Sequence, residues 1–147
     1  MFAWSPHKVI EKASAESFMA QMLPGISAED CLNAHLGVDP GKVGSQNVEA
    51  SQFMFYQRNI GPSAYLILWQ VAIAGDKSIT RIATAQAYPQ LLVNVLAQYY
   101  PLYHLVTLYE CPTLPTDEIR IEWIPLKDFT KAEISLLTTM AIPPARK

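Results

Sequence analysis

Apolar and polar positions in the first 45 residues recur at the three- and four-residue spacing of helices. A first helix is expected over residues 14–23, with Ser14 as its N-cap. Ser27 and Asp30 have the spacing of a capping box, so a second helix begins there and ends at Gly37. This part of the chain is therefore predicted to be helical.

The pattern changes after a predicted loop at 38–47, because apolar positions from Val48 onward alternate as they do in strands. The aromatic run at 53–56 predicts a first strand. Residues 64–74 are apolar on both faces, which is typical of a central strand and places Trp69 in the core. Residues 79–84 are expected to return as an antiparallel strand.

The second half of the chain predicts a helix, two strands and a last helix. Three-four spacing predicts a helix over 89–100, and a strand is expected at 102–109. A strand over 118–124 should turn Glu118, Arg120 and Glu122 to water and Ile119, Ile121 and Trp123 to the core. The capping-box spacing of Thr130 and Glu133 predicts a final helix that ends before Pro143.

The element order is α-α-β-β-β-α-β-β-α, which predicts the α+β class with a five-stranded antiparallel or mixed sheet and helices packed on it. One domain is expected over 1–147, with a helical part at 1–45, sheet and helices at 46–147, and a tail at 143–147 whose last three residues are expected to be frayed. On element order alone, the chain is similar to the small dimeric chaperones that accompany bacterial secreted effectors.

Composition narrows the choice of partners. Half of the residues are hydrophobic, only 16% are charged, and the net charge is −2, so nucleic acid is not an expected partner. The run Ile82–Tyr109 lacks Asp, Glu, Lys and Arg, but Pro89, Pro101 and several polar side chains argue against membrane insertion. The amino-terminal residues do not resemble an export signal, and a cytoplasmic protein is expected.

The sequence offers little recognisable chemistry. Phosphate-binding, dinucleotide-binding, nucleophile-elbow and zinc-protease motifs are absent, and no cofactor, metal site or catalytic residue is expected. Cys31 and Cys111 lie far apart in sequence and are expected to be reduced thiols. His104 lies among apolar strand residues, where a hydrogen-bonded structural histidine is the favoured interpretation over a catalytic one.

The helix at 89–100 carries the strongest hint of function, because uncharged amides recur on the face opposite its apolar side. Amides can bond to a partner without the desolvation cost of charge, and tyrosines add contact area. A small neutral surface patch, or a helix that is buried inside the fold, explains the amides equally well. The expected binding residues are Gln90, Asn94, Gln98, Tyr99, Tyr100, Tyr103 and Arg81.

Two functional hypotheses follow from these residues. The first is a non-catalytic, homodimeric protein-binding module: an adaptor, a secretion-type chaperone, or an inhibitor or immunity protein that contacts another protein through this surface. The second is a small enzyme or small-molecule-binding domain with a pocket near Trp69, Arg81, His104 and Tyr103.

Overall fold

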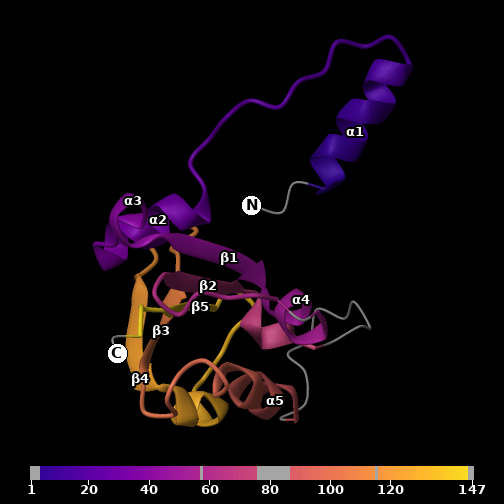
Figure 1. Cartoon of the computed structure of the whole chain (residues 1–147). Helices are drawn as coiled ribbons and strands as arrows, with labels where there is room; N and C mark the ends of the chain where they lie inside the picture. Colours follow the sequence, from indigo (N-terminus) through magenta and orange to yellow (C-terminus); the bar gives the residue numbers. More distant parts are fainter. Residues whose placement is uncertain (1–3, 57, 76–86, 115, 146–147) are drawn as a thin grey trace. The chain divides into compact units, whose positions relative to one another are not determined.

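A computed structural model describes residues 4–56, 58–75, 87–114 and 116–145 of the chain (Figure 1). The chain divides into two compact units, residues 1–38 and residues 39–147. In the described part of the chain, none of the helices has the length and apolar character that a membrane crossing needs. The expected strand at 79–84 lies outside the described residues.

The first unit contains helix α1 (Trp4–Ala15) and helix α2 (Ala28–Leu36). The predicted helix at 14–23 is wrong, because α1 ends where Ser17 adopts a left-handed φ of 66°. The amide of Phe18 then donates to the carbonyl of Ala13, a pattern that terminates helices. Ser14 is therefore near the end of a helix and not at its start.

The second helix is confirmed in its start and its end. The Ser27 hydroxyl accepts from the amide of Asp30 at 3.3 Å, while the Asp30 carboxylate accepts from the amide of Ser27 at 2.7 Å. Gly37 ends α2 at a φ of 63°. These signals act over three or four residues, so they can be read from the sequence.

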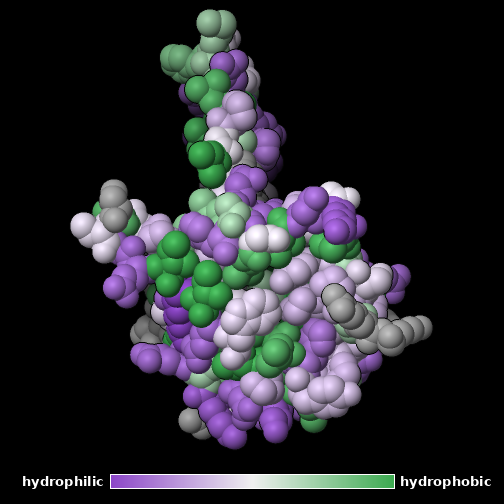
Figure 2. All heavy atoms as spheres, turned by 90° about the vertical axis from the view of Figure 1, so that its left-hand side faces the viewer, coloured by the Kyte–Doolittle hydropathy of each residue, from purple (hydrophilic) through white to green (hydrophobic). Residues whose placement is uncertain are grey.

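Exposed apolar side chains are frequent in the first unit, where α1 has no buried residue (Figure 2). In this unit the exposed large hydrophobic residues are Trp4, Val9, Phe18, Met19, Leu23 and Ile26.

The second unit is built on a five-stranded mixed sheet, which confirms the predicted α+β class. Its strands are β1 (Ser45–Glu49), β2 (Tyr65–Trp69), β3 (Leu105–Glu110), β4 (Arg120–Pro125) and β5 (Thr139–Ile142). Their order is β1-β2-β5-β3-β4, with β1 parallel to β2 and the other neighbours antiparallel.

Helices pack on one face of this sheet (Figure 1). They are α4 (Ala50–Phe55), α5 (Ala87–Leu96) and the 3-10 segment η2 (Leu126–Lys131), and a one-turn helix α3 (Pro40–Val43) precedes β1. The core joins residues of these helices to alternate residues of the central strands: Phe53, Leu66, Leu68, Leu92, Leu96, Val106, Leu108, Phe129, Met140 and Ile142.

Strand β2 is the central strand that its sequence predicts, since Tyr65 to Leu68 are all buried. The strand is shorter than the expected range 64–74, because Gln70 turns into the 3-10 segment η1 (Val71–Ile73). Trp69 is half-buried at the end of the strand, so the expectation that it belongs to the core is wrong.

Three further predictions of local structure are wrong. The expected loop at 38–47 contains α3 and most of β1, and the expected strand at 53–56 lies largely in α4. The Glu49 side chain accepts from the amides of Ser51 and Gln52 and so begins α4. The expected helix after Thr130 is replaced by the end of η2, an irregular segment and β5.

The two faces of β4 are reversed relative to the prediction. Ile121 and Trp123 are 40% and 49% exposed, whereas the Arg120 side chain turns inward to Glu110 on β3. β4 is an edge strand with one neighbour, and such a strand can leave apolar side chains at the surface. In β4 the face that forms the Arg120–Glu110 ion pair turns inward.

Candidate functional site

The carboxyl termini of three strands lie at the same end of the sheet. Because β2 and β3 are both antiparallel to β5, they run parallel to one another, and β1 runs parallel to β2. The strands therefore end together at Glu49, Trp69 and Glu110, beside the starts of β4 and β5. We call this the carboxyl end of the sheet, and the opposite end the amino end. Ligands of open α/β sheets bind beyond the carboxyl ends of strands, which makes this the candidate site.

Side chains of β1 and β2 connect the two strands at the carboxyl end. The indole N–H of Trp69 donates to the side-chain oxygen of Asn47 at 3.1 Å. The carboxylate of Glu49 accepts two backbone amides of α4, each at 2.9 Å. Both interactions fix the positions from which the chain leaves the parallel strands.

The segment after β2 has unusual backbone geometry. Gln70 has a φ of 58° and a ψ of 41°, which side-chain-bearing residues rarely adopt, and Gly75 has a φ of 84°. The Ser51 hydroxyl donates to the carbonyl of Ile73 at 3.4 Å and accepts from the amide of Gly75 at 3.1 Å. Non-glycine residues held in this conformation cost of order 1 kcal/mol and cluster at ligand sites. Gln70 is therefore a candidate ligand contact.

Gly75 is required by close packing as well as by its backbone conformation. A Cβ at this position would lie 2.5 Å from Cδ1 of Tyr88 on α5. The segment from Gln70 to Gly75 is thus held between α4 and α5 with little room to move.

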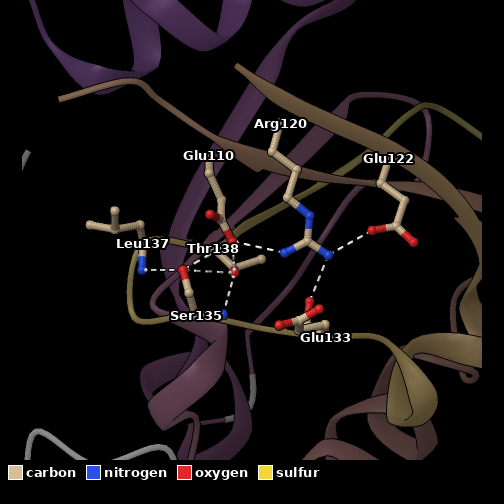
Figure 3. A network of polar contacts seen from close by, with 7 residues as sticks. All are labelled: Glu110, Arg120, Glu122, Glu133, Ser135, Leu137 and Thr138. Atoms are coloured by element: carbon tan, nitrogen blue, oxygen red, sulfur yellow. Dashed lines mark hydrogen bonds and ion pairs between the residues drawn. The ribbon is translucent and has the colours of Figure 1, made fainter. Parts of the chain in front are cut away.

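A network of polar side chains occupies the other half of the carboxyl end (Figure 3). The guanidinium of Arg120 donates to Glu110 at 2.9 Å, to Glu122 at 2.6 Å and to the carbonyl of Glu133 at 2.6 Å. The hydroxyls of Ser135 and Thr138 donate to the same oxygen of Glu110 that accepts from Arg120. The network joins β3 and β4 to the segment that precedes β5.

The electrostatics of this network favour the charged forms of its members. Burial opposes ionisation of Glu110, but hydrogen bonds from Thr138, Ser135 and Arg120 hold the pKa of its carboxyl below its ordinary value. Hydrogen bonding to Glu122 raises the pKa of Arg120 further, with Glu110 adding to the effect. Both groups are therefore ionised at neutral pH, and Glu110 is not a general acid there.

The arrangement is better suited to binding than to acid–base chemistry of its own. In the described ranges, no three His, Cys, Asp or Glu side chains come together as metal ligands. The carboxylates of Glu49 and Glu110 both accept hydrogen bonds from the protein itself. The carboxyl end of the sheet can thus present a fixed surface to a ligand. That surface includes the strained backbone at Gln70 and the indole of Trp69.

The predicted amide positions lie at the surface, two on α5 and Gln98 in the turn that follows it, because the helix expected at 89–100 ends at Leu96. Gln90, Asn94 and Gln98 are exposed, and the Gln90 amide donates to Asn94 at 3.0 Å. Their burial inside the second unit is therefore excluded as an explanation for the missing charges. We call these three residues the amide stripe.

The predicted tyrosines separate into different environments. Tyr103 is 77% exposed, whereas Tyr100 is 1% exposed and belongs to the core, so its assignment to a binding surface is wrong. Burial raises the pKa of Tyr100 to about 12. Tyr99 is half-buried, with its hydroxyl 3.5 Å from the carbonyl of Arg58. Arg81 lies outside the described residues.

The structure does not bring together the expected pocket near Trp69 and His104. The His104 ring lies 2.9 Å from the carbonyl of Pro143 and packs beside the Tyr100 ring, at the amino end of the sheet. Trp69 lies at the carboxyl end, five residue steps along the strand direction from His104, or about 16 Å. His104 is the hydrogen-bonded structural histidine that its sequence context favours.

Sequence reasoning named Trp69 but missed the roles of Gln70, Glu110 and Arg120 at the carboxyl end. Glu110 is the last residue of β3 and its only charged one, and Arg120 is the first residue of β4. Opposite charges at the adjoining ends of two consecutive strands could have indicated an ion pair between them. For Gln70 no sequence signal exists, because its positive φ is imposed by the packing around η1.

No family model matches the chain. Curated relatives match nearly all of it and are named methyltransferases joined to precursors of ribosomally synthesised cyclic peptides. The gymnopeptide protein of Gymnopus fusipes is 34% identical, with 98% of this chain and 35% of that protein covered. A type I borosin protein of Coprinopsis marcescibilis is 34% identical, and the match covers 98% of this chain and 38% of that protein. The dendrothelin A protein of Dendrothele bispora is 33% identical, covering 100% and 36%.

A solved structure supports the same comparison at the level of the fold. The methyltransferase CobJ superposes with a TM-score of 0.61 at 16% identity, covering 96% of this chain and 59% of that one. The chain spans about a third of the length of the curated relatives it matches.

These comparisons contradict the expected non-catalytic protein-binding module. The relatives that match the chain are named enzymes, so the adaptor, chaperone and inhibitor or immunity hypotheses are wrong. The similarity of element order to secretion chaperones was misleading, because several of the elements that supported it are not formed. The relatives' names agree in class with the second hypothesis, an enzyme, whereas Trp69 and His104, which that hypothesis expected in one pocket, lie at opposite ends of the sheet.

Proposed function

We propose that this chain forms part of a methyltransferase that acts on a peptide. The observation that carries the proposal is the match of nearly the whole chain to proteins whose names join a methyltransferase to a ribosomally synthesised peptide precursor. The likeness to CobJ supports the fold that this activity would use.

The geometry of the carboxyl end supports a ligand-binding role within such an enzyme. The ends of β1, β2 and β3 converge there, and the strained Gln70 begins a segment that the Ser51 hydroxyl holds through Ile73 and Gly75. Strain that a fold maintains at one point is typical of a functional contact. We therefore assign Gln70 and Trp69 to the wall of the substrate or cofactor site.

The expected methyl donor for this chemistry is S-adenosylmethionine. The described residues at the carboxyl end suit its binding only in part. A ribose is commonly held by a free carboxylate at the carboxyl end of a strand. Both oxygens of Glu49 accept from the amides of α4, and one oxygen of Glu110 accepts from Thr138, Ser135 and Arg120, so neither carboxylate is wholly free. The described residues of this end therefore do not complete a donor site, and we derive no step through the donor.

The proposal can be tested with the tagged protein purified from its native cell. The protein is incubated with S-adenosylmethionine that carries an isotopically labelled methyl group, and its peptides are analysed by mass spectrometry. We expect labelled methyl groups on a peptide chain. A folded protein that transfers no label to any peptide contradicts the proposal.

We also propose that copies of this chain associate through the amide stripe. All three stripe residues are exposed, and Tyr103 adds a largely exposed aromatic ring. Placing lysines at Gln90 and Asn94 should weaken self-association, because an unpaired charge buried in an interface is costly. Stability should change by no more than about 0.5 kcal/mol, as at other surface positions. Light scattering that shows unchanged assembly, or a monomer before substitution, contradicts this proposal.

A further inference from the structure

A groove between α4 and α5 forms a second site in the sheet-bearing unit. Its volume is about 260 Å³. This is just below the range of roughly 300 to 1,000 Å³ typical of pockets for small organic ligands. An occupant of this groove would therefore be about as large as a single aromatic residue.

The floor of the groove is apolar and well supported. Phe53 on α4 is 3% exposed, and Met54 and Val95 pack against the core beside it. A rigid apolar floor can bury a ring or a branched aliphatic group and gain the free energy of removing that surface from water.

The rim of the groove is polar and positively charged. The Arg58 guanidinium lies 5.6 Å from the centre of the Tyr56 ring, and the Tyr99 hydroxyl lies 3.5 Å from the Arg58 carbonyl. These contacts from both sides place Arg58 at the groove, where the exposed amide of Gln98 adds a further donor.

The charge of Arg58 has no carboxylate partner within the described ranges. The ion pairs of the described residues involve Lys8, Arg120 and Lys131. A guanidinium binds carboxylates and phosphates through two parallel hydrogen bonds. The apolar floor favours an anion that is joined to an apolar body, as in an aromatic or branched aliphatic carboxylate.

We propose that this groove binds a monocarboxylate with an apolar body. The carboxylate is held by Arg58 with help from Gln98, and the body rests on Phe53, Met54 and Val95. Two sources share this chemistry: a free carboxylic acid, and the last residue of a peptide with a free carboxyl terminus. The inference goes beyond the proposed methyl transfer and does not depend on it.

The probe for this site is N-acetyl-L-phenylalanine, titrated into the purified protein by calorimetry. We expect saturable binding, and binding of the neutral N-acetyl-L-phenylalanine amide that is at least about tenfold weaker, as for loss of one charge-assisted hydrogen-bonded pair. Equal affinities for the acid and the amide, or no saturation at millimolar concentration, would overturn the proposal.

Variants locate the site. Arg58→Gln should weaken acid binding by at least about tenfold, and Arg58→Lys should retain part of the affinity, since lysine keeps the charge but not the planar fork. Lys42→Gln on α3 removes an exposed cation outside the groove and should change nothing. Circular dichroism confirms folding. The assignment is contradicted if folded Arg58→Gln binds N-acetyl-L-phenylalanine with unchanged affinity, or if Lys42→Gln loses as much affinity as Arg58→Gln.

Short peptides identify the source of the carboxylate. One peptide ends in phenylalanine with a free carboxyl group, and its partner ends in the amide. Tighter binding of the free-carboxyl peptide supports a peptide terminus as occupant, while binding of N-acetyl-L-phenylalanine alone supports a small free acid. Binding of both peptides with one affinity contradicts the carboxylate requirement. None of these measurements involves methyl transfer, so their failure leaves the proposed activity untouched.

Discussion

The two ends of the sheet are held together by different kinds of interaction. At the amino end, main-chain hydrogen bonds join neighbouring segments beside the uncharged contact of His104: the amide of Ala145 donates to the Pro62 carbonyl at 2.8 Å, and the amide of Leu126 donates to the His104 carbonyl at 2.9 Å. At the carboxyl end, side chains carry the connections, with Glu110 and Arg120 at the centre of one network.

This difference indicates which end of the sheet is suited to a specific function. Backbone hydrogen bonds depend little on residue identity, so the amino end closes the fold for many sequences. Charged networks and a left-handed Gln70 depend on particular residues and bring strain or desolvation costs. We infer that the carboxyl end carries the specific function and the amino end carries general stability.

The largest effect is expected from Gly75→Ala at the carboxyl end. The new methyl group would meet Tyr88 at 2.5 Å in a backbone conformation with φ of 84°. We expect destabilisation by about 2 to 5 kcal/mol, the sum of left-handed strain and overpacking. Gly61→Ala near the amino end has no positive φ and no atom closer than 3.9 Å, so it should cost less than about 1 kcal/mol. Equal denaturation midpoints for the two variants would remove this contrast.

Arg120→Met should cost about 1 to 3 kcal/mol at neutral pH, because it leaves the half-buried Glu110 carboxylate without its cation. The matched control is Lys131→Met, whose exposed pair with Asp128 should contribute less than about 1 kcal/mol. Urea denaturation of both variants measures the difference. A cost for Arg120→Met no larger than that of the control shows that the network is not stabilising.

The same network predicts how stability depends on pH. The pKa of Glu110 is lowered in the folded state, so its contribution is complete above its unfolded value and is lost as pH falls through the lower folded value. Acid destabilisation that starts below about pH 4.5, the ordinary value for glutamate, should therefore be smaller in Arg120→Met. If the free energy of unfolding falls with pH in the same way in Arg120→Met and in the parent protein, the ion pair does not lower the pKa of Glu110.

His104→Phe tests the amino end. It keeps a ring beside Tyr100 but removes the hydrogen bond to the Pro143 carbonyl, and it should cost about 1 kcal/mol. Methyl transfer should be unaffected, because this residue lies away from the carboxyl end. Loss of transfer in a stably folded variant would place His104 in the functional site after all.

The smallest change in stability is expected for Gln70→Gly. Glycine accepts a φ of 58° without strain, so the variant should be as stable as the parent or more stable by up to about 1 kcal/mol. If the Gln70 side chain contacts a ligand, methyl transfer should fall while stability does not. Full activity in this variant would show that the left-handed turn serves the fold alone.

The parts of the fold that could be predicted depend on neighbouring residues. The capping box of Ser27 and Asp30 and the buried run of β2 are visible in short windows of sequence. Phe53 and Phe55 alternate like a strand, yet Ala50, Phe53 and Met54 also have helical spacing. The side chain of Glu49, which caps α4, decides between the two.

The parts that were missed depend on residues far apart in the sequence. Ser135 and Thr138 bond to Glu110, which is 25 and 28 positions away, and this holds their segment out of the helix that Thr130 and Glu133 suggested. The inward turn of Arg120 likewise reverses β4. Of the predicted binding residues, the structure leaves the stripe and Tyr103 at the surface. Helical spacing accounts for the exposure of Gln90 and Asn94 on α5, whereas the carboxyl end could be located only from the full topology.

The position of β5 has a consequence for how the chain folds. β5 is the last of the five strands along the chain, yet it lies between β2 and β3 in the sheet. Until residues 139–142 have been synthesised and inserted, β2 and β3 each present an unpaired, apolar strand edge. Such edges favour association with other chains, and pairing across long sequence separations is slow. Nascent chains that stop before β5 should therefore be bound by chaperones or aggregate, and completion of the sheet should be the late step of folding.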